Sequence, residues 1–142
     1  MMIKDIMTAN PDAVSVTTNA FEAAQKMKDL NVGGLPVEKD GQVAGLVTDR
    51  DLVVRVLAET RDPSDTSVGD IMSKGLLSCK ESDSIEEAAQ IMKREKVRRL
   101  VVTDENDKMI GILSLGDLAT KGDKETAKEV TSAVSDPSSP NR

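Results

Sequence analysis

Two short motifs with the same spacing carry the residues that are best suited to bind a ligand. Thr48 stands three residues before Asp51 in GLVTDRD, and Ser114 stands three residues before Asp117 in GILSLGD. In both motifs an apolar, strand-like stretch ends where a helix is expected to begin. One interpretation is a helix cap, in which the hydroxyl accepts a hydrogen bond from a first-turn amide. The other is a binding site, in which the carboxylate accepts hydrogen bonds from a ribose diol and the hydroxyl faces a phosphate. Both can hold together, because a cap positions the side chains.

Several kinds of catalytic chemistry are excluded by composition. The chain has no histidine, the commonest general base and metal ligand and the usual partner of a nucleophilic serine or cysteine. Cys79 is the single cysteine, so neither an intrachain disulfide nor a Cys/His metal motif is available. Turn and surface placement explains carboxylate pairs such as Asp49/Asp51. The sequence therefore predicts a binding protein that is not an enzyme and holds no metal.

Charge and hydropathy narrow the range of partners. The net charge of −6 repels phosphate backbones at long range, and Phe21 is the only aromatic residue, so nucleic-acid binding is disfavoured. No segment approaches the roughly 18 consecutive apolar residues that span a bilayer. The start, MMIKDIMTAN, lacks the apolar run of a signal peptide. We expect a soluble cytoplasmic protein without a membrane partner.

An internal repeat divides the chain. An offset of 65 residues aligns 5–7 (DIM) with 70–72 and 22–25 (EAAQ) with 87–90, and more than a third of the positions from 5 to 37 are identical to their counterparts. One inserted residue in the turn at 104–107 shifts the offset to 66 and brings the two motifs into register. The repeat predicts this division: repeat 1 at 1–60, a linker at 61–67, repeat 2 at 68–121, and a polar, partly disordered tail at 122–142.

Each repeat is predicted to form a strand, a helix, two paired strands and a second helix. The first helices are expected to be capped by Asn19 and Ser84, each followed three residues later by a glutamate. The other expected elements are strands at 13–16, 35–37, 42–48, 76–79, 99–104 and 108–114, helices at 49–59 and 115–121, and weak helicity at 123–134. Because one repeat is too short to bury both faces of its sheet, we expect the two repeats to pack together and leave a groove along their pseudo-two-fold seam.

The repeated motifs resemble those of a tandem pair of CBS domains, also called a Bateman module. The resemblance covers about residues 1–120 and rests on the D-I-M-[TS] starts, the E-A-A-Q helices, the L-P-V strand and the G-h-h-[TS]-x-x-D endings. The segment 96–118 is also similar to a repeat in the nucleotide-sensing subunit of AMP-activated protein kinase. The resemblance implies an α/β fold of two β-α-β-β-α repeats packed sheet to sheet about a pseudo-two-fold axis. It also implies adenine nucleotides, AMP, ADP or ATP, in clefts between the repeats.

The same resemblance implies a set of ligand-binding residues. In one cleft, Thr48 and Asp51 would meet the phosphate side and the ribose of the nucleotide. The opposite repeat would supply Arg99 for the phosphate and an adenine pocket made of Leu76, Leu77 and Val97. In the other cleft, Ser114 and Asp117 would face Pro11, Asp12, Val32 and Gly34.

The two clefts are not expected to be equivalent. Arg98 and Arg99 align with Gly33 and Gly34, so the second cleft lacks a phosphate cation. For both arginines, a solvent-facing charge pair at the edge of a strand is the alternative interpretation.

The functional expectation is a non-enzymatic sensor whose Thr48/Asp51 cleft reports the energy state of the cell to a regulated protein that the sequence does not identify. Two alternatives remain open: a ligand-free assembly module, and a binder of another adenosyl ligand such as S-adenosylmethionine. We also expect a homodimer, because the second helix of each repeat presents apolar residues, which are Leu52, Val53, Val56 and Leu57, then Leu118 and Ala119.

Overall fold

The structure is a computed structural model, and it describes residues 1–135 of the chain. The chain forms two compact units. The first-repeat unit is Pro11–Leu76, and the second-repeat unit combines Met1–Asn10 with the chain from Leu77 onward. The disorder that we predicted for 135–142 falls, apart from Ser135, outside the described residues. No helix of the described part is long and apolar enough to cross a membrane.

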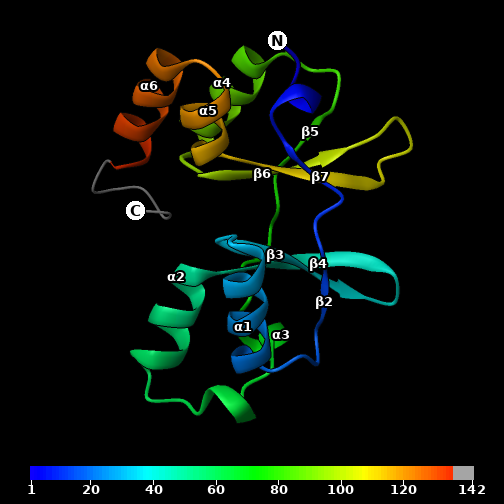
Figure 1. The fold of residues 1–142 in the computed structure, drawn as a ribbon, viewed down its shortest axis with the longest axis vertical. Helices are drawn as coiled ribbons and strands as arrows, with labels where there is room; N and C mark the ends of the chain where they lie inside the picture. Colours follow the sequence, from blue (N-terminus) through cyan, green and yellow to red (C-terminus); the bar gives the residue numbers. More distant parts are fainter. Residues whose placement is uncertain (136–142) are drawn as a thin grey trace. The chain divides into compact units, whose positions relative to one another are not determined.

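A three-stranded sheet forms the centre of the first-repeat unit, in the order β2 (Val14–Ser15), β3 (Gly34–Lys39) and β4 (Gln42–Thr48). β2 runs parallel to β3, and β3 pairs antiparallel with β4. Helices cover one face of this sheet (Figure 1). They are α1 (Ala20–Leu30), α2 (Asp49–Leu52) with its π-helical continuation η2 (Val53–Leu57), the 3-10 turn η3 (Pro63–Asp65) and α3 (Val68–Ile71).

The helix α1 begins where the sequence predicted. The Asn19 side chain accepts a hydrogen bond from the Glu22 amide (2.8 Å) and donates one to the Glu22 carboxylate (3.0 Å). Ala20, Ala23 and Met27 are buried at helical spacing against the sheet. The second helix also follows the prediction, but η2 gives its last turn a π-helical form.

The second-repeat unit has a four-stranded sheet in the order β1 (Thr8–Ala9), β7 (Met109–Ser114), β6 (Arg99–Thr103) and β5 (Ser78–Lys80). β5 runs parallel to β6, while β6–β7 and β7–β1 are antiparallel. Its helical elements are η1 (Ile3–Asp5), α4 (Ile85–Glu95), α5 (Leu115–Lys121) and α6 (Lys124–Val134). The mixed α/β fold class and the repeated order of elements are confirmed, while sheet-to-sheet packing of the repeats stays a prediction.

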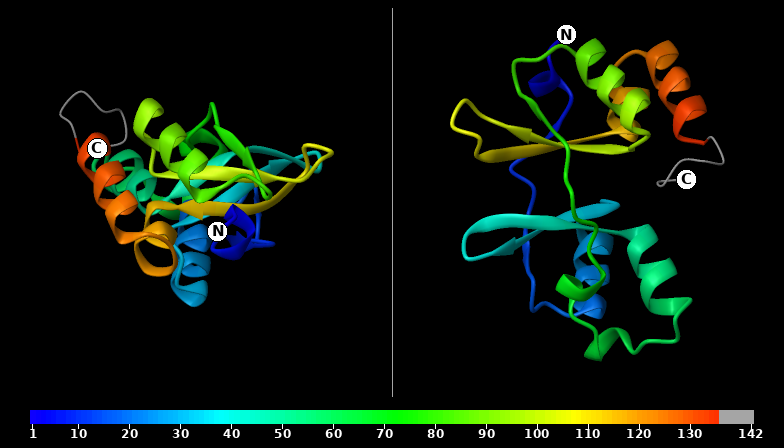
Figure 2. Two further views of the ribbon diagram at one scale, coloured as in Figure 1. Left: turned by 90° about the horizontal axis from the view of Figure 1, so that it is seen from above. Right: turned by 180° about the vertical axis from the view of Figure 1, so that it is seen from behind.

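The C-terminal helix α6 is more regular than the weak helicity that we predicted. Its side chains Ala127, Val130 and Val134 are buried, and it packs against both α4 and α5 (Figure 2). An ion pair joins Lys93 of α4 to Glu129 of α6, with 3.0 Å between Nζ and Oε2. Tertiary packing of this apolar stripe explains why a segment with a polar composition forms a complete helix. Residues 124–134 therefore belong to the core of the unit.

The compact units exchange the lead-in segments of the two repeats. Ile3 and Ile6 precede repeat 1 but are buried in the core of the second-repeat unit, and Val68 and Ile71 precede repeat 2 but are buried in the core of the first-repeat unit. The division between the units therefore differs from a division at residues 61–67. That segment also contains η3 and the buried Thr66, whose carbonyl accepts a hydrogen bond from the Ala20 amide (2.8 Å).

A glycine on the last strand of each repeat permits this exchange. A Cβ on Gly45 would lie 2.7 Å from the Ser73 carbonyl oxygen, and one on Gly111 would lie 2.6 Å from the Met7 sulfur. Real Cβ atoms do not approach other atoms so closely. The glycine that opens each motif is thus explained by the close approach of a lead-in segment, through the Ser73 backbone at Gly45 and mainly through the Met7 side chain at Gly111.

Candidate functional site

The Thr48 and Asp51 side chains form a reciprocal cap at the start of α2. The Thr48 hydroxyl accepts a hydrogen bond from the Asp51 amide (3.1 Å), and Asp51 Oδ2 accepts one from the Thr48 amide (2.9 Å). Each group thereby satisfies an amide that the first helical turn leaves unpaired. Asp51 is only 5% exposed. The cap interpretation of this motif is confirmed, and the cap fixes the orientation of a buried carboxylate.

The second motif repeats this geometry at the start of α5. The Ser114 hydroxyl accepts from the Asp117 amide (3.1 Å), and Asp117 Oδ2 accepts from the Ser114 amide (2.9 Å). Asp117 is 8% exposed. At the level of the cap, the two motifs are therefore equivalent.

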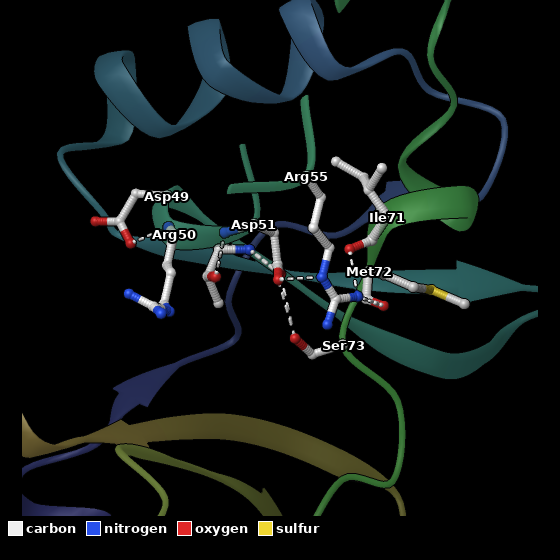
Figure 3. A network of polar contacts seen from close by, with 8 residues as sticks. Asp49, Arg50, Asp51, Arg55, Ile71, Met72 and Ser73 are labelled. Carbon is white, nitrogen blue, oxygen red and sulfur yellow. Dashed lines mark hydrogen bonds and ion pairs between the residues drawn. The ribbon is translucent and has the colours of Figure 1, made fainter. Parts of the chain in front are cut away.

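Beyond the cap, Asp51 has two further neighbours that we did not predict. The Ser73 hydroxyl lies 3.1 Å from Asp51 Oδ1 and 3.3 Å from Oδ2, and Arg55 Nε lies 3.8 Å from Oδ1 (Figure 3). The same guanidinium donates through Nη1 to the carbonyl oxygens of Ile71 (3.1 Å) and Met72 (3.2 Å). Asp51 is therefore tied to the lead-in segment of repeat 2. The only sequence signal for Ser73 was the hydroxyl that ends both D-I-M-[TS] starts.

Asp117 has simpler surroundings. Lys121 occupies the position that corresponds to Arg55, with its Nζ 3.8 Å from Asp117 Oδ1. Thr8 corresponds to Ser73 and pairs with Ile112 through the backbone. Within residues 1–135, no hydrogen bond joins the Thr8 hydroxyl to Asp117. The two carboxylates thus differ in what competes for their oxygens.

The other predicted site residues are divided between the two units. Leu76, half-buried, ends the first-repeat unit that also contains Thr48 and Asp51. Leu77 and Val97 are half-buried against the core of the second-repeat unit. The predicted grouping of these apolar side chains around one adenine stays a prediction.

The two arginines lie at the end of β6 that adjoins the second motif. Arg99 opens β6 and is the register partner of Ser114, and the Arg98 carbonyl accepts a hydrogen bond from the Leu115 amide (2.8 Å). Both side chains are half-buried and both have interaction partners. Within its own unit, Arg99 therefore belongs to the strand pair of Ser114. Its predicted role beside Asp51 rests on the family resemblance.

Neither metal ligands nor a reactive thiol add to the site. In the part of the chain that the structure describes, no group of three or more His, Cys, Asp or Glu side chains could hold a metal ion. Cys79 is buried, and this burial, together with the charge of Asp83, raises the pKa of the thiol to about 12. The thiol is therefore protonated near neutral pH and is a poor nucleophile.

Comparisons with known proteins agree with the repeated motifs. The family model of the CBS domain matches the chain twice, at residues 3–58 and 68–123. The chain is 42% identical over 136 residues to the uncharacterized protein YlbB of Bacillus subtilis, covering 94% of this chain and 89% of that protein. It is also 42% identical over 117 residues to the CBS domain-containing protein YhcV of the same organism, covering 82% of each. A crystal structure of CBSX2 in complex with AMP aligns with a TM-score of 0.67 and 31% identity, covering 83% of this chain and 93% of that chain. The chain therefore belongs to the CBS-domain family, as a tandem pair of CBS domains.

Proposed function

We propose that this CBS pair is a non-enzymatic regulatory module that binds an adenine nucleotide, AMP, ADP or ATP, with the ribose at Asp51. The observation that carries the proposal is the buried Asp51 carboxylate, which the Thr48 cap holds in a fixed orientation. A related solved structure, CBSX2, is in complex with AMP. A preoriented carboxylate suits a ribose diol, because the two adjacent hydroxyls donate charge-assisted hydrogen bonds to its two oxygens.

The phosphate of the nucleotide is assigned to Arg99 in this proposal, with Thr48 beside it and Arg98 as an additional cation. A guanidinium recognises phosphate through paired hydrogen bonds, and Gly34 occupies the aligned position in repeat 1. Arg99→Ala should weaken the binding of AMP by roughly tenfold or more, since a hydrogen bond to a charged group contributes about 1.5–3 kcal/mol. Adenosine has no phosphate, so its affinity should change far less.

Thermal unfolding in the presence of candidate ligands tests the function directly. A ligand at 100 times its dissociation constant stabilises the folded state by about 2.7 kcal/mol. AMP, ADP, ATP and S-adenosylmethionine should each be measured at saturating concentration, with Asp51→Asn as the control variant. A rise in melting temperature with S-adenosylmethionine alone would show that the site binds this adenosyl ligand and not a nucleotide. No shift with any of the four would favour the ligand-free assembly module instead.

We also propose that two copies of the chain pair through the second helix of repeat 1. The side chains of Val53, Val54 and Leu57 are 56%, 41% and 65% exposed, which is unusual for neighbouring aliphatic residues. Two residues of the predicted interface do not support it, because Val56 and Leu118 are only 2% and 0% exposed. The interface is therefore proposed on η2 and not on α5. The regulated protein stays unidentified.

A further inference from the structure

The carboxylate of Asp51 receives more hydrogen-bond donors than a helix cap needs. The Thr48 amide already completes the cap at Oδ2. The Ser73 hydroxyl then lies at nearly equal distances from the two oxygens, 3.1 and 3.3 Å. A donor that is almost equidistant from both oxygens lies at the open edge of a carboxylate, where a ribose diol would also donate. Ser73 thus occupies the acceptor edge that the proposed ligand needs.

The position of Ser73 is set by contacts on both sides of it. Its amide donates to the Leu46 carbonyl (2.8 Å) and its carbonyl accepts from the Leu46 amide (3.0 Å), so the backbone is joined to β4. Arg55 holds the two preceding carbonyls, those of Ile71 and Met72. These bonds fix the backbone of Ser73 beside Asp51, while its side chain can still rotate the hydroxyl away.

We propose that Ser73 is an intramolecular competitor that determines the affinity of the Asp51 site: its hydroxyl occupies the carboxylate in the empty state and is displaced by the ribose diol. This inference rests on the proposed function. The Ser73 hydroxyl covers both Asp51 oxygens, at 3.1 and 3.3 Å, so a ribose diol must displace it to reach them. Among the described residues, Asp117 has no such cover from Thr8. The competition is therefore specific to one of the two carboxylates.

Removal of a competitor changes the affinity for the ligand in the opposite direction to removal of a supporting residue. Removal of a residue that only supports the site weakens binding, or leaves it unchanged. Removal of a competitor tightens binding, because the ligand no longer has to break an existing hydrogen bond. The sign of the affinity change therefore distinguishes the two roles.

The test is AMP calorimetry on the full chain carrying Asp117→Asn, so that the signal comes from the Asp51 site. Ser73→Ala should tighten AMP binding roughly three- to tenfold, the range that corresponds to one ordinary hydrogen bond. Ser73→Thr keeps a hydroxyl and should bind like the parent chain. Thr8→Ala removes the corresponding hydroxyl of the other repeat and should leave the affinity unchanged.

The stability of the empty protein provides a second measurement. Ser73→Ala should lower the melting temperature of the empty chain while it raises the affinity for AMP, and misfolding cannot produce this pair of opposite changes. If Ser73→Ala does not fold, Ser73→Cys, a near-isosteric weak donor, should show the same tightening to a smaller extent.

Each outcome separates this inference from the proposed function. Equal or weaker AMP binding by Ser73→Ala and Ser73→Cys, in a chain whose parent binds AMP, overturns the competitor and leaves the function standing. The same tightening by Thr8→Ala also overturns it. A parent chain that binds no adenosine compound overturns both.

Discussion

A carboxylate in the first turn of a helix can serve the fold and a ligand at the same time. Asp51 and Asp117 both pair with the amide three residues before them, at 2.9 Å in each case. A cap of this kind is worth about 1 kcal/mol to the fold. The cap leaves other lone pairs of the carboxylate available for a ligand. The two repeats differ in the side chains that contact those lone pairs, which are Ser73 and Arg55 at Asp51 and Lys121 at Asp117.

The two carboxylates should make unequal contributions to nucleotide binding. Asp51→Asn keeps an oxygen that can accept from the Thr48 amide but removes the charge, so AMP affinity measured by calorimetry should fall by roughly tenfold or more. Asp117→Asn should leave the stronger site nearly unchanged, because the predicted phosphate cation Arg99 is assigned to the other carboxylate. Equal losses in the two variants would show that the phosphate has been assigned to the wrong site.

Cys79 should make folding stability sensitive to alkaline pH. Burial raises the pKa of its thiol from 9.0 to about 12, so the folded state keeps the proton after the unfolded state has lost it. The contribution of the protonated Cys79 thiol to folding stability is complete below pH 9.0 and is lost as the pH rises towards 12. Urea unfolding should show an additional loss of about 1–2 kcal/mol between about pH 8 and pH 10.5.

The matched control for this pH dependence is Cys79→Ala. Its titratable lysines are those of the parent chain, so only the contribution of the thiol should disappear from the difference between the two pH values. An identical pH dependence in parent and variant would contradict the raised pKa.

At the scale of elements, a lead-in segment crosses the last strand of each repeat at a glycine. Gly45 faces the Ser73 carbonyl oxygen, a backbone atom that cannot rotate away, so Gly45→Ala should cost about 1–3 kcal/mol in the free energy of unfolding. The control is Gly116→Ala in α5, where the new Cβ would meet Ser114 Oγ at an ordinary 3.5 Å. That variant should be neutral or up to about 1 kcal/mol more stable, because alanine favours a helix. Denaturant titration measures the free energy of unfolding of both variants. Similar values for Gly45→Ala and Gly116→Ala would contradict the close approach of Ser73 to Gly45.

The elements that could be predicted from the sequence are those specified by neighbouring residues. β4 begins and ends where predicted, and the caps at Asn19, Thr48 and Ser114 follow from side chains three residues apart. α6 was underestimated, because its stability comes from packing on α4 and α5, which local composition does not contain. Ser73 was missed for a similar reason, since its partner Asp51 is 22 residues away.

At the scale of the whole molecule, the two repeats are interdependent because they exchange their lead-in segments. Ile3 and Ile6 complete the core that the second repeat forms, and Val68 and Ile71 complete that of the first. A repeat cut out at its sequence boundaries would lose buried side chains of its own core and carry others that have no partner. The sequence identity between repeats revealed the duplication, but it did not show which core each lead-in joins.

The two units also differ in what covers their second helices. In the second-repeat unit, α6 packs on α5 and Leu118 is fully buried. In the first-repeat unit, Val53, Val54 and Leu57 on η2 remain exposed. Removal of exposed apolar side chains from water lowers the free energy, so this surface is the better candidate for self-association.

A charged residue on this surface should therefore separate a dimer into monomers. Leu57 is the most exposed of the three side chains at 65%, so Leu57→Lys places a charge in the interface without disturbing the core of its unit. In sedimentation equilibrium at micromolar concentration, the parent chain should have twice the mass of the 15.2 kDa monomer, and Leu57→Lys should have the monomer mass. Met2→Lys, at a 41% exposed methionine of the other unit, should remain dimeric. A parent chain that sediments as a monomer would contradict the proposed pairing. A Leu57→Lys variant that remains dimeric would show that the interface does not lie on η2.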